Sequence, residues 1–197
     1  MPSPSVEVKQ YTEEIVKRYG TAEQIMALFN PDLQSRYVSE ERRCLTGNAP
    51  SIARMAKAYG ENIAISWLSI QIYDLVKFCS FEDKIDINQV NDVAVILFTD
   101  APFLKLTEWM MFFYRFKRGE YGEFFGRFDG VKVGVALKEF KSWRRSELDR
   151  YSNEERRERE KAEEKAHSER VAEFKRNLGR PIRISELRQY FMTEDLK

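Results

Sequence analysis

The sequence predicts an all-α protein, an irregular multi-helix bundle with a long charged C-terminal helix. Apolar residues recur at the i, i+3, i+4 spacing of amphipathic helices along most of the chain. Side chains that can cap a helix precede several of these segments, and glycine or proline follows them. A chain of 197 residues is long enough for one well-buried core and too short to assume two full domains.

Residues 1–47 are expected to form an N-terminal helical wrap, because their apolar stripes are too thin to build a core. Thr21 and Gln24 have the spacing of a capping box, in which each side chain bonds the other residue's backbone amide. Pro31 suits the first turn of a helix, and residues 46–48 break the chain again. The helices expected here cover residues 6–18, 21–29 and 31–43.

Residues 48–150 are expected to form the helical core domain. Residues 62–79 carry apolar side chains on two faces, which is typical of a central helix. The run VAVILF at 93–98 would fit a buried strand, but Asp86 at a capping position favours a helix. Thr107 is predicted to cap a helix in the same way. The helices expected in this domain cover residues 50–59, 62–79, 86–99 and 108–117, and a fifth follows Asp129.

Residues 109–134 hold nine of the 26 aromatic residues and five of the nine glycines. Lys117 and Arg118 stand at a helix C-terminus, where cations favour the helix dipole, and Gly119 suits the position just beyond the helix end. Asp129 is expected to cap the next helix. Asp129-Gly130 is also a hairpin signal, but the strands within 124–135 would be only about four residues long, so we prefer the helix.

This aromatic and basic segment has two interpretations. As a nucleic-acid or partner-binding surface, Lys117, Arg118, Arg127 and Lys132 would meet phosphates while Tyr121 stacks on a base. As a packing corner, the aromatics would fix the loop to the core and the cations would stay in water. We favour the packing corner, because large aromatic side chains drive core formation.

Residues 151–197 are expected to form a charged helical arm and a docking tail. Ser152 and Glu155 have capping-box spacing, and opposite charges four residues apart support a solvated helix. Its apolar seam is too short and too poor in leucine for a coiled coil. The tail that follows is predicted to contain a turn capped by Ser185, with docking side chains at Leu187, Tyr190 and Phe191.

The composition argues against a metal site, a catalytic nucleophile and a nucleotide-binding loop. Cys44, Cys79 and His167 are too few and too scattered for a zinc site, and the single histidine lies far in sequence from either cysteine. Neither GxGxxG nor GxxxxGK[ST] occurs. We therefore expect no catalytic residues, no metal and no cofactor. The two cysteines lack a CxxC arrangement, which favours a reducing compartment.

Charge and hydropathy limit the partners. With 33 Lys+Arg against 32 Asp+Glu the net charge is +1, so the overall charge of the chain does not favour binding to nucleic acid or to a membrane surface. The N-terminus lacks the apolar core of a signal peptide, and apolar runs do not exceed six residues. A cytoplasmic protein with no membrane contact is expected.

One motif resembles a known family. Leu104 to Asp129 reads L-x-L-x-E-W-x-x-F-F-x-x-F-K-x-G-x-Y-G-x-F-F-G-x-F-D. This pattern resembles an uncharacterised family of small helical proteins carried by phages and mobile elements of gut bacteria, mainly over residues 50–145. Gly130 stands where that family usually has proline. The resemblance implies a mobile-element context, in which small non-enzymatic proteins often serve DNA replication or its regulation.

These observations lead to two functional hypotheses. The first is a non-enzymatic helical adaptor, a DNA-replication accessory or regulator of a phage or mobile element, that binds a protein partner. The alternative is a protein that binds single-stranded nucleic acid directly through the surface at residues 117–132. The sequence leaves the oligomeric state and the identity of the partner open.

Overall fold

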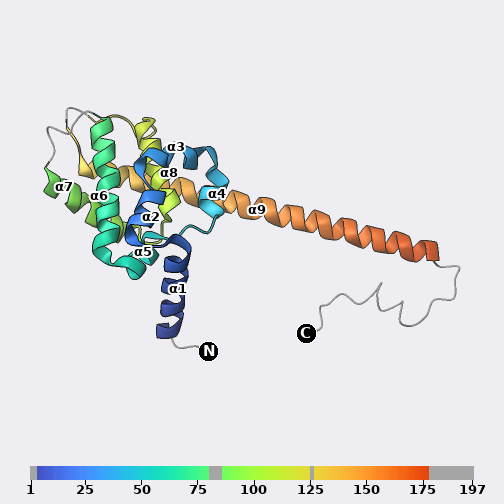
Figure 1. The fold of residues 1–197 in the computed structure, drawn as a ribbon. Coiled ribbons are helices and arrows are strands. Elements are labelled where there is room, and N and C mark those ends of the chain that lie inside the picture. Colours follow the sequence, from blue (N-terminus) through green and yellow to red (C-terminus); the bar gives the residue numbers. More distant parts are fainter. Residues whose placement is uncertain (1–3, 80–85, 125–126, 178–197) are drawn as a thin grey trace. The chain divides into compact units, whose positions relative to one another are not determined.

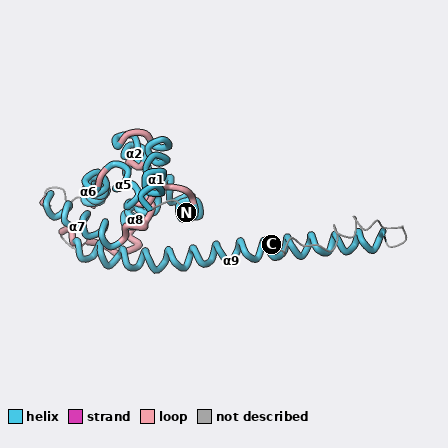
Figure 2. Tube along the Cα trace, turned by 90° about the horizontal axis from the view of Figure 1, so that it is seen from below, coloured by secondary structure: helices cyan, strands magenta, loops and turns pink. Residues whose placement is uncertain are grey.

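The described residues of the computed structural model are 4–79, 86–124 and 127–177, with side chains described from residue 12 onward. Over these residues the secondary structure is helical with connecting loops, and no strand is present (Figure 2). The all-α prediction is confirmed. The chain divides into two compact units, with the boundary between Leu148 and Asp149. Residues 1–47 therefore belong to the same unit as the residues that follow them up to Leu148.

The helices follow one another along the chain as labelled in Figure 1. Their bounds are α1 Pro4–Tyr19, α2 Ala22–Leu28, the 3-10 helix η1 Pro31–Leu33, α3 Gln34–Ser39, α4 Glu41–Thr46, α5 Ile52–Tyr59, α6 Glu61–Phe78, α7 Ile87–Asp100, α8 Leu106–Lys117 and α9 Gly130–Asn177.

Several predicted helix ends are confirmed. The backbone amide of Gln24 donates to the Thr21 hydroxyl at 3.3 Å, and the Thr21 amide donates to the Gln24 side chain at 2.8 Å. Asp86 accepts from the Asn88 amide at 2.9 Å and caps α7, which settles the VAVILF run as a helix. At the end of α8, Gly119 has a φ of 78°, a conformation that glycine adopts without strain.

The single helix expected over residues 31–43 is wrong. Residues 31–46 instead form η1, α3 and α4, and the helix breaks at Glu40, whose φ and ψ are −116° and 52°. The Ser39 hydroxyl donates to the Arg36 carbonyl at 2.8 Å, which offers the backbone an alternative to a continued helix. The Cys44 thiol donates to the Tyr37 carbonyl at 2.6 Å across the break.

Two predicted caps are also wrong. Thr107 lies inside α8, where its hydroxyl donates to the Cys44 carbonyl at 3.0 Å, and Lys105 takes the capping position. Ser152 lies inside α9, which runs without interruption from Gly130 to Asn177. Residues 135–178 contain neither glycine nor proline, so no residue in that stretch forces a helix to end.

The start of α9 confirms the preferred interpretation of residues 124–135. Asp129 accepts from the amides of Val131 and Lys132 at 2.9 and 3.3 Å, as an N-cap residue does. No hairpin forms over the residues of this stretch that the structure describes. Gly130 packs so closely that a Cβ atom there would lie 2.6 Å from Cγ2 of Val93 on α7.

The most buried helix is α8, whereas the two-faced pattern of residues 62–79 had favoured α6 as the central helix. Ile70 and Tyr73 on the second face of α6 are 44% and 46% exposed. In α8, every residue from Leu106 to Phe113 is buried, as is Phe116. Helix α8 packs against α3, α4 and α6, and α6 also contacts α5 and α7.

Within the described residues, no helix combines the length and apolar character needed to cross a bilayer. The predicted tail, with Ser185, Leu187, Tyr190 and Phe191, lies outside the described residues.

Candidate functional site

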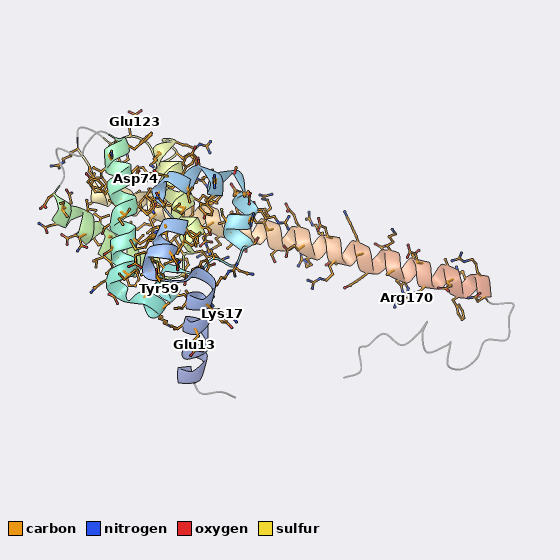
Figure 3. The ribbon with its side chains drawn as sticks, viewed as in Figure 1. Glu13, Lys17, Tyr59, Asp74, Glu123 and Arg170 are labelled. Carbon is orange, nitrogen blue, oxygen red and sulfur yellow. The ribbon has the colours of Figure 1, made fainter. Side chains whose placement is uncertain are left out.

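The sequence-predicted site is the corner between α8 and α9, and we call residues 117–132 the basic corner. Lys117 lies at the end of α8 and donates through Nζ to Oδ2 of Asp74 on α6, which is labelled in Figure 3. The same ammonium lies 5.7 Å from the ring centroid of Phe78. The Lys117 side chain is only 15% exposed, so its charge is committed to the core.

Lys132 is also engaged within the corner. Its ammonium donates to the carbonyl oxygen of Glu123 and lies 5.7 Å from the ring centroid of Phe124. Arg118 forms a longer ion pair with Glu120 at 3.4 Å and keeps a side chain that is 56% exposed. Arg127 is exposed. The structure therefore leaves Arg118 and Arg127 as the accessible cations among the four that the sequence singled out.

Tyr121 packs against the core and is not presented as an open stacking surface. Its ring centroid lies 5.6 Å from that of Phe112 and 5.3 Å from that of Phe116. The hydroxyl oxygen is buried and has no hydrogen-bond partner among the described residues. Burial raises the pKa of this phenol. Nucleic-acid or partner binding by the corner stays a prediction, but its geometry is that of a packing element.

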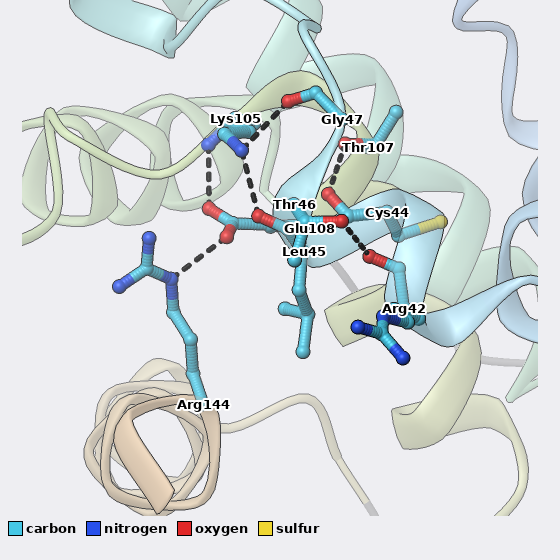
Figure 4. A network of polar contacts seen from close by, with 9 residues as sticks. All are labelled: Arg42, Cys44, Leu45, Thr46, Gly47, Lys105, Thr107, Glu108 and Arg144. Atoms are coloured by element: carbon cyan, nitrogen blue, oxygen red, sulfur yellow. Dashed lines mark hydrogen bonds and ion pairs between the residues drawn. The ribbon is translucent and has the colours of Figure 1, made fainter. Parts of the chain in front are cut away.

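A buried ionic network lies at the start of α8, at the opposite end of the helix from the basic corner, where the sequence predicted no site (Figure 4). The carboxylate of Glu108 is fully buried and accepts from Nε of Arg144 on α9 at 2.8 Å and from the Lys105 amide at 2.8 Å. Nζ of Lys105 donates to the carbonyl oxygens of Leu45 and Gly47, at 2.6 and 2.7 Å. The network thus ties the start of α8 to α9 and to the end of α4.

The pKa values in this network shift because its charges are buried. Burial raises the pKa of Glu108, and the hydrogen bond from the Lys105 amide and the Arg144 guanidinium oppose that rise. Burial lowers the pKa of Lys105. A buried carboxylate with two donors is the expected pattern for a structural ion pair. A sequence signal did exist, because Glu108, in the first turn of α8, is the single charged residue in the stretch 106–114.

Cys44 and His167, which the sequence analysis weighed as reactive groups, lie in different environments. The Cys44 thiol is buried, and burial raises its pKa to about 12, so at neutral pH it is a hydrogen-bond donor and not a thiolate nucleophile. His167 is exposed on α9. Among the described residues, no group of three or more His, Cys, Asp or Glu side chains is placed to hold a metal ion.

A second cluster of cations and aromatics surrounds two adjoining cavities of about 380 and 390 Å³, which we together call the basic hollow. Helix α1, the loop between α4 and α5, and residues of α2 to α4 form its walls. Both cavities are lined by the residues Arg18, Tyr19, Gly47, Asn48 and Ala49. The charged side chains around the hollow are Arg18, Arg36, Arg43, Arg54 and Lys105, with Glu14 and Glu40.

Sequence reasoning missed the hollow, although the sequence held a signal for it. The dipeptide Arg-Tyr occurs at 18–19, 36–37 and 150–151, and the first two copies line the hollow. The two copies belong to α1 and α3, so only the fold brings them to one surface.

The arm, defined as residues 149–177 of α9, is the last candidate. It contains nine acidic and nine basic residues, and every residue from 155 to 173 is exposed. Opposite charges pair along the helix surface at 3.1 Å for Arg150 with Glu154, 3.7 Å for Arg156 with Glu160 and 3.9 Å for Lys165 with Glu169. Such i, i+4 pairs support a helix whose side chains are solvated.

One family model matches residues 84–179, just under half of the chain, and its description is "Family of unknown function (DUF6633)". The matched residues include the basic corner, the arm, and the Lys105, Glu108 and Arg144 members of the buried network, but not Leu45 or Gly47. Of the side chains that line the basic hollow, only Lys105 and Thr107 fall within the matched residues. No curated protein and no solved structure gave a match.

Proposed function

We propose that this protein is a non-enzymatic helical adaptor, an accessory or regulator of DNA replication in a phage or mobile element, which binds a protein partner through its arm. The observation that carries the proposal is the arm itself. A helix with 19 consecutive exposed residues (155 to 173) and balanced charge exposes a long polar surface while it stays helical.

The balance of charge favours a protein partner for the arm over nucleic acid. Phosphates are met by an excess of Lys and Arg, whereas the arm holds equal numbers of acidic and basic residues. An alternating charge pattern of this kind suits a partner with a complementary pattern and gives specificity more than affinity. The replication context rests on the resemblance of residues 104–129 of this chain to proteins of mobile elements.

The inert thiol of Cys44 and the structural use of Glu108 support a non-enzymatic role. Both groups are buried and bonded within the protein, Cys44 to the Tyr37 carbonyl and Glu108 to Arg144. Neither is offered to a substrate. A cytoplasmic location is part of the proposal, and it rests on the two cysteines without a CxxC arrangement, which favour a reducing compartment.

Affinity capture from the natural host tests the adaptor role. Three baits are compared: the full chain, a chain lacking residues 152–197, and a chain whose arm is permuted with its composition and its i, i+4 pairs kept. We expect the full chain alone to retain a replication protein. If all three baits retain the same proteins, the arm is not the binding element and the proposal fails.

A further inference from the structure

The basic hollow carries more positive charge than the chain as a whole. Five cationic and two acidic side chains line it, an excess of three, whereas the full chain has a net charge of +1. Arg18, Arg36, Arg43 and Arg54 are all exposed. Arg43 pairs with Glu40 at 2.8 Å in a surface ion pair whose side chains are 81% and 54% exposed, so the pair opens at little cost.

A row of aromatic rings accompanies these arginines. The ring centroids of Tyr19 and Phe29 lie 6.0 Å apart, and those of Phe29 and Tyr37 lie 5.9 Å apart. The Tyr37 hydroxyl donates to the Leu28 carbonyl at 3.2 Å, and the Tyr19 hydroxyl lies 3.4 Å from the Asn48 carbonyl. These bonds fix the two tyrosine rings, which are half-buried and line the cavity wall.

Fixed aromatic rings beside exposed arginines are the two components of single-stranded nucleic-acid binding. Bases stack on aromatic side chains, while a positively charged groove follows the phosphates. Each cavity of the hollow falls within the size range of ordinary ligand pockets. The bases of a duplex are already stacked on one another and cannot stack on the tyrosine rings. An acidic peptide would contact the arginines but has no bases to stack on the rings.

We propose that the basic hollow binds single-stranded nucleic acid. Arg18, Arg36 and Arg43 meet the phosphates, and Tyr19 and Tyr37 stack on bases. Stacking on tyrosine rings and contact with phosphates do not depend on base identity, so the binding tolerates many sequences. This inference does not rest on the adaptor role, because neither the arm nor the basic corner contributes to the hollow.

Fluorescence anisotropy with a labelled oligothymidylate of about 10 nucleotides tests the inference on the full chain. The variant carries Arg18→Ala, Arg36→Ala and Arg43→Ala, all at exposed positions. The charge-matched control carries Arg157→Ala, Arg159→Ala and Arg170→Ala, which are exposed on the arm. Thermal unfolding of each protein is followed in parallel to establish that the fold is intact.

We expect the hollow variant to lose roughly tenfold or more in affinity at low salt. Each lost phosphate contact reduces the slope of log K against log salt by about 0.7, so three contacts reduce it by about 2. The arm control should bind as the wild type does. Absence of binding by the wild type, or equal losses in both triple variants, overturns the inference.

The proposed stacking of a base on Tyr37 is tested by comparing the oligonucleotide affinities of the Tyr37→Leu and Tyr37→Phe variants. The leucine variant should lose roughly fivefold or more, because one stacked base is lost, and the phenylalanine variant should retain most of the affinity. Equal affinity of the two variants overturns the stacking role. A polyglutamate peptide of the same charge is the final competitor. If it displaces the labelled oligonucleotide as well as an unlabelled oligonucleotide does, the hollow binds acidic polypeptides and the inference is overturned.

Discussion

The basic corner and the basic hollow both combine cations with aromatic rings, but the corner's lysines are bonded within the protein and the hollow's arginines are exposed to solvent. In the corner, the ammonium groups of Lys117 and Lys132 are bonded to Asp74 and to a backbone carbonyl, and Tyr121 is packed between Phe112 and Phe116. In the hollow, the arginines are exposed and the tyrosine rings line an open cavity. Whether a cation is available to a ligand depends on the partners that the fold gives it, and not on the aromatic residues beside it.

The comparison predicts that removing a cation used within the fold costs stability, whereas removing an exposed one does not. The largest effect is expected for Arg144→Met, because the carboxylate of Glu108 would stay buried without its guanidinium. Breaking a buried pair in this way costs about 3–5 kcal/mol. Urea unfolding near neutral pH measures the loss, and Arg145→Met at the exposed neighbouring position should be close to neutral.

The same variant should also change how stability depends on pH. Burial raises the pKa of Glu108 in the folded protein, so its protonated form favours folding at low pH, and that contribution is lost as pH rises through the raised pKa. Without Arg144 one influence that opposes the rise is gone, so the stability lost as pH rises above the ordinary glutamate pKa should be larger than in the wild type. An identical pH dependence of unfolding in the two proteins would contradict the assigned contact.

A smaller loss, about 1–3 kcal/mol, is expected for Lys117→Met. The substitution leaves the partly buried carboxylate of Asp74 without its ion pair. Asp74→Asn in the same chain should restore part of the stability, so a double-mutant cycle should show coupling between the two positions. Additive effects of the two substitutions would place Lys117 among the accessible cations and favour the corner as a binding surface.

Tyr121→Phe should leave stability unchanged or raise it by up to about 1 kcal/mol. The phenol oxygen is buried without a partner among the described residues, so removing it removes a desolvated polar atom and keeps the ring contacts. Guanidinium unfolding compares the two proteins. A clear loss of stability would mean that the hydroxyl has a hydrogen-bond partner.

Arg127→Ala should have the smallest effect, within about 0.5 kcal/mol, because the side chain is exposed. It also separates the two surfaces in the anisotropy experiment. If Arg127→Ala and Lys117→Ala together abolish oligonucleotide binding while the hollow variant binds normally, the corner is the nucleic-acid site and the comparison between the two regions is reversed.

Local patterns were sufficient for most helices. The capping box of Thr21 and Gln24, the caps at Asp86 and Asp129 and the glycine after α8 depend on residues within four positions of each other, so the sequence shows them directly. The errors at Ser152 and Thr107 also come from local patterns. Each residue has the spacing of a helix cap in the sequence, but in the structure each lies within a helix.

The sequence alone determined that the protein is helical, where most helices begin and end, and that the arm is charged and balanced. It could not determine which helix is central or which charges are buried, because both depend on residues far apart in the chain. Glu108 meets Arg144 36 residues away, and Arg18-Tyr19 shares the basic hollow with Arg36-Tyr37 from another helix. Tertiary packing decided these pairings, since burial and the partners it provides set the state of every charge in the two regions.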